Sequence, residues 1–279
     1  MSADPGIGLD RLSLNQATVK YLNLEEAAAL CVRHAIPAIG LWRDRVAEIG
    51  LAEAVRVVRS AGLRVSSLCR GGFFTRAAGE GLRAALADNR AAVAEAAELG
   101  ADTLVLVCGG LVPGSRDIGL ARRMVADGIG ELVPFAQGLG VRLGIEAFHP
   151  MFCADRCVIA SLGEAVDLVL TFPADAVGLL VDTYHVWWDA RLTAEIARAA
   201  GRVAGYQVGD WVLPLPQDTL LGRGHLGDGV IDFGPITQAV TAAGYRGYAE
   251  VEIFNEDVWN APADQTAATV LERFAAVMG

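Results

Sequence analysis

Four polar side chains interrupt apolar runs in the second half of the sequence, and together they could bind a metal ion and move protons. Glu146 follows RLGI, Asp182 follows VGLLV, Gln207 lies in GYQVGD, and Glu252 lies in YAEVEIF. Three carboxylates and an amide brought to one place would repel each other unless a cation lay between them. Oxygen ligands of this kind suit a hard divalent cation such as Mg²⁺ or Mn²⁺ better than a structural zinc ion.

The chain that positions these residues alternates short apolar runs with longer, alanine-rich amphipathic segments, one of which covers residues 46–62. The apolar runs are continuous, which is typical of parallel strands covered on both faces. Several amphipathic segments end in a glycine before the next run, which predicts left-handed caps at helix C-termini. The eight runs cover residues 12–16, 38–42, 64–69, 102–110, 141–148, 176–188, 202–210 and 248–254, and the capping glycines are Gly62, Gly100, Gly140, Gly201 and Gly244.

Eight strand-then-helix units in 279 residues fit a (β/α)8 TIM barrel better than a doubly wound sheet. No linker, low-complexity tract or block of charge divides the chain, so we expect one domain over residues 1–279. Chemistry in such a barrel lies at the carboxyl ends of the strands, and the four polar residues end the fifth to eighth strands. Any one of them alone could be a cap or a solvent-facing group, but four at matching positions predict a metal site.

Composition excludes several classes of function. The chain has 23 Lys and Arg against 33 Asp and Glu, and this net charge of −10 argues against nucleic-acid and anionic-membrane partners. No uncharged stretch exceeds thirteen residues, whereas a membrane span needs roughly 20 apolar ones. The first twelve residues lack the features of a signal peptide, and five cysteines without a CxxC pair favour reduced thiols in a cytoplasmic protein. The single lysine, Lys20, follows the first strand, which argues against Schiff-base chemistry.

The strings around the four polar residues resemble a known family. IEAFHPMFCADRCVI, VDTYHVWWD, YQVGDW, GRGHLGDGVIDF and VEIF are similar to the xylose isomerase-like TIM barrels, and within them to the sugar phosphate isomerase/epimerase group. A softer likeness extends to LSLNQAT, IGLWRDRV and SSLCRGGFF. The resemblance implies a metal-dependent isomerase or epimerase acting on a small sugar, sugar acid or hydroxy-carbonyl compound. The metal ligands that it implies are Glu146, Asp182, Gln207 and Glu252.

One ligand position departs from the commonest family pattern. Many members have His where this chain has Gln207, whereas relatives resembling hydroxypyruvate isomerase have Gln there. A neutral amide oxygen in place of an imidazole shifts the preference further toward hard cations. We therefore expect Mn²⁺ or Mg²⁺, with Co²⁺ and Zn²⁺ as alternatives.

These residue types permit proton transfer beside a carbonyl group. A metal chelated by two adjacent sugar oxygens stabilises the enediolate that forms when a neighbouring carbon loses its proton. One carboxylate takes that proton and a second returns it. In the ketose epimerases that the chain resembles, the two glutamates beside the metal do both, which implies Glu146 and Glu252 as the acid/base pair. Glu250 shares a strand face with Glu252 and should lie deeper in the barrel.

Four further residues are candidates for substrate binding. His185 completes a DxxH pattern whose imidazole contacts a substrate oxygen in the family, and His149 and Arg156 lie in the loop after Glu146. Arg223 lies among glycines after the seventh strand, where barrels often hold phosphate, and could bind a phosphate or a carboxylate. Three tryptophans could stack on a sugar or simply pack, namely Trp187, Trp188 and Trp211.

Three functions other than an isomerase are compatible with a barrel of this kind. A lyase resembling inosose dehydratase would begin with the same proton abstraction. A DNA repair enzyme resembling endonuclease IV would need extra histidines on the third and fourth strands, where this chain has Cys69, Arg70 and Cys108. A catalytically silent sugar-binding barrel is disfavoured by intact Glu146 and Glu252.

The charge, the apolar runs and the family resemblance together indicate which partners to expect. We expect a small-molecule carbohydrate substrate, no nucleic acid and no membrane partner. Because relatives are frequently dimers or tetramers, the resemblance also implies a homodimer or homotetramer.

Overall fold

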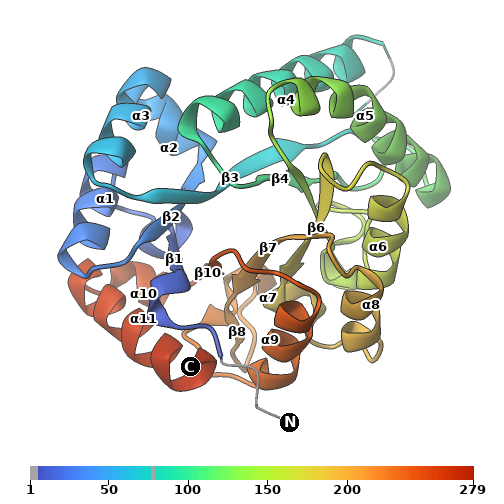
Figure 1. Cartoon of the computed structure of the whole chain (residues 1–279). Helices are drawn as coiled ribbons and strands as arrows, with labels where there is room; N and C mark the ends of the chain where they lie inside the picture. Colours follow the sequence, from blue (N-terminus) through green and yellow to red (C-terminus); the bar gives the residue numbers. More distant parts are fainter. Residues whose placement is uncertain (1–5, 77–78) are drawn as a thin grey trace.

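The computed structural model describes residues 6–76 and 79–279, which form a closed barrel of parallel strands surrounded by helices (Figure 1). The strand order is β1-β10-β7-β6-β5-β4-β3-β2, and β1 pairs with β10 to close the barrel. The predicted (β/α)8 architecture is therefore confirmed. The barrel strands are β1 (Leu12–Asn15), β2 (Ala38–Trp42), β3 (Arg64–Gly72), β4 (Leu104–Val107), β5 (Leu143–Glu146), β6 (Val177–Asp182), β7 (Val203–Val208) and β10 (Ala249–Val251).

The helices follow the predicted amphipathic segments. The capping glycines all have positive φ, between 67° and 91°, as predicted. The segment at 46–62 differs, because Gly50 has a φ of 82° and separates two helices where the pattern indicated one. The helices are α1 (Leu24–Arg33), α2 (Arg43–Ile49), α3 (Leu51–Ser60), α4 (Glu80–Leu99), α5 (Ile118–Gly138), α6 (Leu162–Leu170), α7 (Thr183–Val186), α8 (Leu192–Arg198), α9 (Phe233–Ala242), α10 (Glu256–Asn260) and α11 (Ala263–Met278).

Short elements occupy some of the connections. An antiparallel pair of two-residue strands, β8 (Asp210–Trp211) and β9 (Arg223–Gly224), lies in the loop region after β7 and was not expected from the sequence. Four 3-10 turns complete the description: η1 (Leu9–Arg11), η2 (Gln16–Val19), η3 (Pro150–Phe152) and η4 (Thr219–Leu221).

The barrel interior has an apolar part and a polar part. Cys69, Val105 and Leu180 form a small cluster separate from the main hydrophobic core. Because β4 and β6 are not neighbours in the sheet, these side chains meet across the inside of the barrel. The polar part surrounds Glu250, and Gly40 on β2 makes room for it, since a Cβ there would lie 2.5 Å from the Glu250 carboxyl group. The larger core fills the space between the strands and the helices.

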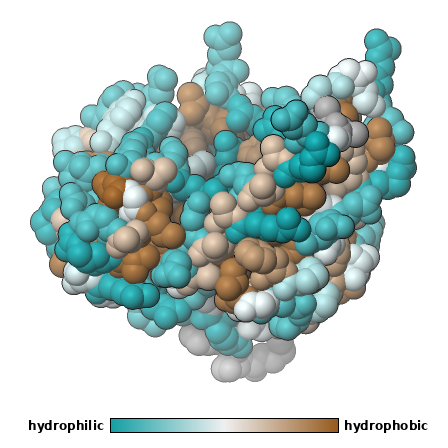
Figure 2. Space-filling view, turned by 90° about the horizontal axis from the view of Figure 1, so that it is seen from above, coloured by the Kyte–Doolittle hydropathy of each residue, from teal (hydrophilic) through white to brown (hydrophobic). Residues whose placement is uncertain are grey.

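The outer surface mixes hydrophilic and hydrophobic residues. In the view of Figure 2, hydrophobic residues gather in patches between hydrophilic ones. Within the described ranges, no helix combines the length and the apolar character needed to cross a bilayer.

The packing of α5 gives a test of the fold. A Cβ at Gly128 would lie 2.3 Å from the buried ring of Phe74, so Gly128→Ala should lower the free energy of unfolding by about 1–3 kcal/mol. At Gly130, two residues along the same helix, a Cβ would make only an ordinary contact, 3.9 Å from Phe172. Gly130→Ala should therefore gain about 0.5–1 kcal/mol, because alanine loses less backbone entropy. Urea denaturation of both variants measures the difference, and equal effects would contradict this packing.

Candidate functional site

The four residues expected to bind a metal lie together at the carboxyl ends of β5, β6, β7 and β10. Glu146 and Asp182 end their strands, Gln207 is one residue from the end of β7, and Glu252 follows β10 directly. All four are buried. A cavity of about 420 Å³ opens at this end of the barrel, and Glu146 and Glu252 line it. The topology therefore brings together the residues that the sequence singled out.

Arg223 supplies the positive charge at the centre of this group. Its Nη2 donates to Asp182 Oδ2 at 2.7 Å, and its Nη1 lies 3.2 Å from Asp182 Oδ1 and 3.3 Å from Glu252 Oε2. The guanidinium also lies 4.6 Å from the ring centre of Tyr184 and 5.3 Å from that of Phe254. Sequence reasoning assigned Arg223 to an anionic substrate group, but in this arrangement the protein's own carboxylates already engage it.

The loop that carries Arg223 is organised by Asp210, which the sequence analysis did not single out. Its carboxylate accepts hydrogen bonds from the backbone N–H groups of Trp211, Gly227, Gly229 and Ile231, at 2.8 to 3.0 Å. Glycine is required at 229, where a Cβ would lie 2.2 Å from the Trp211 carbonyl oxygen. The glycine-rich string therefore folds around a carboxylate of the chain itself.

Burial and like charges hold two of the carboxylates toward their protonated forms. Burial, together with the charges of Asp182 and Glu252, raises the pKa of Glu146 well above its ordinary value. Burial raises the pKa of Glu252 to about 8, although Arg223 acts in the opposite direction. Burial opposes ionisation of Asp182 as well, but the charge and hydrogen bonds of Arg223 outweigh it and lower the pKa of that carboxyl group. Asp182 is thus the fixed anion, and the two glutamates can exchange protons.

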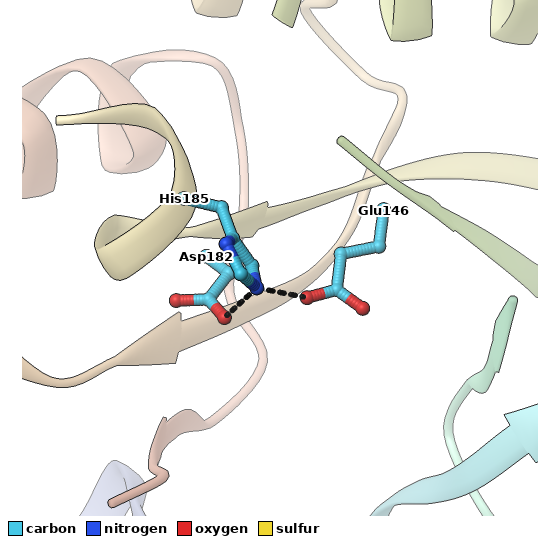
Figure 3. A group of neighbouring side chains, drawn as sticks. All are labelled: Glu146, Asp182 and His185. Carbon is cyan, nitrogen blue, oxygen red and sulfur yellow. Dashed lines mark ion pairs between the residues drawn. The ribbon is translucent and has the colours of Figure 1, made fainter. Parts of the chain in front are cut away.

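His185 lies between two of these acids. Its Nε2 is 3.8 Å from Glu146 Oε1 and 3.9 Å from Asp182 Oδ2, and the dashed lines in Figure 3 join these atoms. Burial lowers the pKa of His185 to about 3, so the imidazole is neutral. The ring stacks on Phe148, with 4.1 Å between ring centres, and this contact fixes its orientation.

The backbone of His149 selects the tautomer of His185. Its N–H donates to His185 Nδ1 at 3.3 Å, which leaves the single proton of the neutral ring on Nε2. Arg223 Nη2 lies 3.4 Å from that Nε2 but makes no hydrogen bond with it in this tautomer, because both groups are donors, and it donates to Asp182 Oδ2. His185 thereby presents an N–H group beside the acids, which suits a contact with a substrate oxygen.

A polar network lies beneath these groups and centres on Glu250, as its position on the strand predicted. Asn15 Nδ2 donates to Glu250 Oε1 at 2.6 Å and to Glu252 Oε1 at 3.0 Å. The side-chain oxygen of Asn15, Oδ1, accepts from Ala17 N at 2.9 Å and from Trp42 Nε1 at 2.8 Å, which fixes the orientation of the side-chain amide. Asn15 therefore positions Glu252, a role that the sequence did not reveal because asparagine at a strand end is also an ordinary cap.

Further donors complete the shell of Glu250. Ser66 and Ser67 on β3 donate to its carboxylate, and Gln207 Nε2 donates to its Oε1 at 2.9 Å. Among the described residues, none donates a hydrogen bond to the side-chain amide oxygen of Gln207, Oε1, while its Nε2 is engaged by Glu250. That oxygen keeps its lone pairs for another partner.

This donor set fits a divalent cation. Three carboxylates, Glu146, Asp182 and Glu252, surround one guanidinium, so full ionisation would leave two negative charges unbalanced. Glu146, Asp182 and His185 can each offer one ligand atom within 4.8 Å of the others. Because His185 carries its proton on the nitrogen that faces the acids, the oxygen atoms are the better ligands.

Not all of the predicted substrate-binding residues line the cavity. His185, Arg223 and Arg156 line it, whereas the side chain of His149 is not among the lining residues and packs 5.1 Å from the ring of Trp211. The aromatic walls are formed by residues other than the three tryptophans considered from the sequence, namely Trp42, Phe73, Phe148 and Phe254. Trp211 is buried and stacks on Tyr184, which is a packing role.

Comparison with known proteins gives a consistent family assignment. A crystal structure of protein SMc04130 from Sinorhizobium meliloti 1021 is 48% identical, with a TM-score of 0.93, and the match covers 96% of this chain and 98% of that one. An inosose isomerase of Bacillus velezensis is 24% identical over 96% of this chain and 97% of its own length. The crystal structure of the IOLI protein with a bound zinc atom is 20% identical, with a TM-score of 0.83, covering 96% of this chain and 98% of that one.

The family profile described as xylose isomerase-like TIM barrel matches residues 26–276. This range contains all four predicted metal ligands and all four predicted substrate-binding residues. The chain belongs to the xylose isomerase-like TIM barrel family.

Proposed function

We propose that this protein is a metal-dependent isomerase or epimerase that transfers a proton beside the carbonyl group of a small sugar, sugar acid or related hydroxy-carbonyl compound. One observation carries the proposal: Glu146 and Glu252 line the same cavity, and both have raised pKa values. They come from strands separated by β6 and β7 in the barrel order, so they reach the cavity from different sides. Such a pair can remove a proton from one position and return it at another.

Glu146, Asp182, Gln207 and Glu252 are the residues that would hold the cation. The free carbonyl oxygen of Gln207 and the excess of negative charge support this set. The zinc atom of the IOLI protein supports a divalent ion in a barrel of this shape. The oxygen-rich donors of this chain favour Mn²⁺ or Mg²⁺ over Zn²⁺ or Co²⁺.

When bound, the cation would polarise the hydroxy-carbonyl group and stabilise the negative charge that develops as the carbon loses its proton. Either glutamate accepts that proton on a carboxylate oxygen, and the other donates one from its protonated form. The Nε2–H of His185 donates toward a substrate oxygen beside Glu146. Asn15 holds the Glu252 carboxylate by its Oε1, which leaves Oε2 directed toward Arg223. The inosose isomerase relative makes a cyclic polyol ketone one candidate substrate.

Hydrogen exchange tests this function directly. With MnCl₂ in D₂O, we expect the protein to incorporate deuterium next to the carbonyl of D-fructose, hydroxypyruvate or an inosose, followed by NMR. Glu146→Gln and Glu252→Gln should each slow the exchange by about 10²- to 10⁴-fold, because each removes one proton carrier.

Glu131→Gln, on the exposed face of α5, is the matched control and should leave the rate unchanged. Retained exchange in both cavity variants would contradict the assignment of the acid/base pair. A dehydrated product would indicate the lyase reaction instead.

Metal affinity tests the role of Gln207. Gln207→Ala should weaken Mn²⁺ binding at least about tenfold, or 1.4 kcal/mol, because it removes one oxygen ligand. Calorimetric titration of Mn²⁺ measures the affinity, and Gln238→Ala on the exposed side of α9 serves as the control. Unchanged affinity in the Gln207 variant would remove this residue from the ligand set.

The charge balance of the site predicts a stability effect for Arg223→Met. In EDTA, this change leaves buried carboxylates without their cationic partner and should cost about 3–5 kcal/mol of unfolding free energy. Added Mn²⁺ should stabilise the variant more than the unaltered protein, because the ion replaces the missing positive charge. Arg59→Met, exposed on α3, is the control.

The pH dependence has a definite sign. The pKa of Glu252 rises from 4.5 to about 8 on folding, so between these pH values the folded protein holds a proton that the unfolded chain has lost. The free energy of unfolding in EDTA should therefore fall as the pH rises from 4.5 to about 8, and it should fall more steeply in Arg223→Met than in the unaltered protein. Urea denaturation at several pH values measures this, and a variant with unaltered stability would contradict the charge-balance argument.

A further inference from the structure

The cavity wall holds a cation that the proposed chemistry does not use. Arg70, near the end of β3, lines the cavity. Its guanidinium carbon lies 4.6 Å from the ring centre of Phe73 and 5.9 Å from that of Trp42, and both aromatic residues also line the cavity. Within residues 6–76 and 79–279, no carboxylate lies within 4.0 Å of Arg70 and no acceptor takes a hydrogen bond from it. Contacts with ring faces orient a guanidinium without using its N–H donors.

A second arginine on the same cavity is only partly compensated. Arg156, in the loop after β5, lies 5.6 Å from the ring centre of Phe152. The closest approaches of its guanidinium to Asp155 and Asp218 are 3.8 and 3.9 Å, longer than hydrogen bonds. Its Nε is buried and has no hydrogen-bond partner among the described residues. Arg156 therefore also has N–H donors to offer.

These two arginines differ from the third arginine of the cavity. Arg223 makes a two-point hydrogen-bonded pair with Asp182 and faces Glu252, so its charge is already balanced. Glu146, Asp182 and Glu252 concentrate negative charge at the ends of β5, β6 and β10, and Asp155 adds a carboxylate beside Arg156. Arg70 provides positive charge on the wall at β3. A ligand that complements this cavity has a hydroxy-carbonyl end for the acids and an anionic end for the arginines.

We propose that Arg70, assisted by Arg156, binds an anionic group of the substrate, so that the substrate class is a sugar acid or a sugar phosphate and not a neutral sugar. The assignment of the other end to Glu146 and Glu252 rests on the proposed function. The planar guanidinium of Arg70 offers parallel N–H donors that match a carboxylate or a phosphate. Because two rings already restrict this side chain, little of its freedom is lost when the anion binds.

Binding of matched polyols tests the proposal without turnover. We choose D-glucitol, D-gluconate and D-glucitol 6-phosphate, which share one carbon skeleton, and lack a ketone or aldehyde to isomerise. Calorimetry with Mn²⁺, and again in EDTA to exclude chelation of the metal by gluconate, gives the three affinities. We expect at least one anion to bind about tenfold or more tightly than glucitol under both conditions. The stronger of the two anions identifies the carboxylate or the phosphate as the recognised group.

Two variants show whether Arg70 is responsible. Arg70→Met keeps an aliphatic contact with the rings and removes the charge, so it should weaken the preferred anion about tenfold and leave glucitol unchanged. Arg76→Met is the matched control, because Arg76 also lies near Phe73, at 5.8 Å, but is not among the residues that line the cavity. Its affinities should equal those of the unaltered protein.

The possible results separate this proposal from the proposed function. Anions that bind no more tightly than glucitol, or that do not bind measurably, would overturn it, as would an equal loss for all three ligands in Arg70→Met. Anion preference in a protein that exchanges no deuterium into the anions hydroxypyruvate and D-fructose 6-phosphate would support the Arg70 site and contradict the isomerase. Deuterium exchange with D-fructose but no preference for anions would support the isomerase and contradict the Arg70 site.

Discussion

The burial of three carboxylates around a single guanidinium is the interaction on which the rest of this site depends. Removing a charge from water is costly, and Arg223 offsets only part of that cost for Glu146, Asp182 and Glu252. Burial and, after it, the neighbouring carboxylates raise the pKa values of the two glutamates, and the site is left short of positive charge. The same imbalance that makes the cluster costly for the fold is what suits it to a divalent cation and to proton exchange.

Much of the surrounding structure serves to hold that guanidinium and its acids in place. The Asp210 carboxylate fixes the path of the loop through four backbone N–H groups, and Tyr184 and Phe254 contact the Arg223 side chain. From below, Asn15 links the buried Glu250 to Glu252. A buried carboxylate such as Glu250 is tolerated because neutral donors from three strands satisfy it. The carboxyl end of the barrel, where the acids lie, is thus supported by polar contacts on both sides.

The features that could be predicted from the sequence are those that depend on neighbouring residues along the chain. Continuous apolar runs identified the buried parallel strands, and polar residues at their ends identified Glu146, Asp182, Gln207 and Glu252. Contacts between distant segments could not be read in the same way. The pairing of Arg223 with Asp182 depends on the path of a loop, and the tautomer of His185 depends on one backbone N–H.

Other features were missed because their local signals have two meanings. Asp210 and Asn15 are common residues at the ends of strands, where they usually cap the next turn. Gly50 within a helical pattern is often tolerated, so the break between α2 and α3 was not distinguishable from a weakened helix. The three tryptophans Trp187, Trp188 and Trp211 were equally ambiguous, since packing and ligand stacking use the same residue type.

Closure of the barrel has a consequence for how the protein is made. Asn15 and Glu250 are 235 residues apart in the chain, and they meet only when β10 pairs with β1. During synthesis from the N-terminus, β1 leaves the ribosome long before its last neighbour, so its outer edge stays unpaired until nearly the whole chain is present. The acidic groups of the site therefore stay hydrated until the final strand pairs. A chain that ends before β10 has two unpaired strand edges and lacks the buried Glu250 network that supports the site.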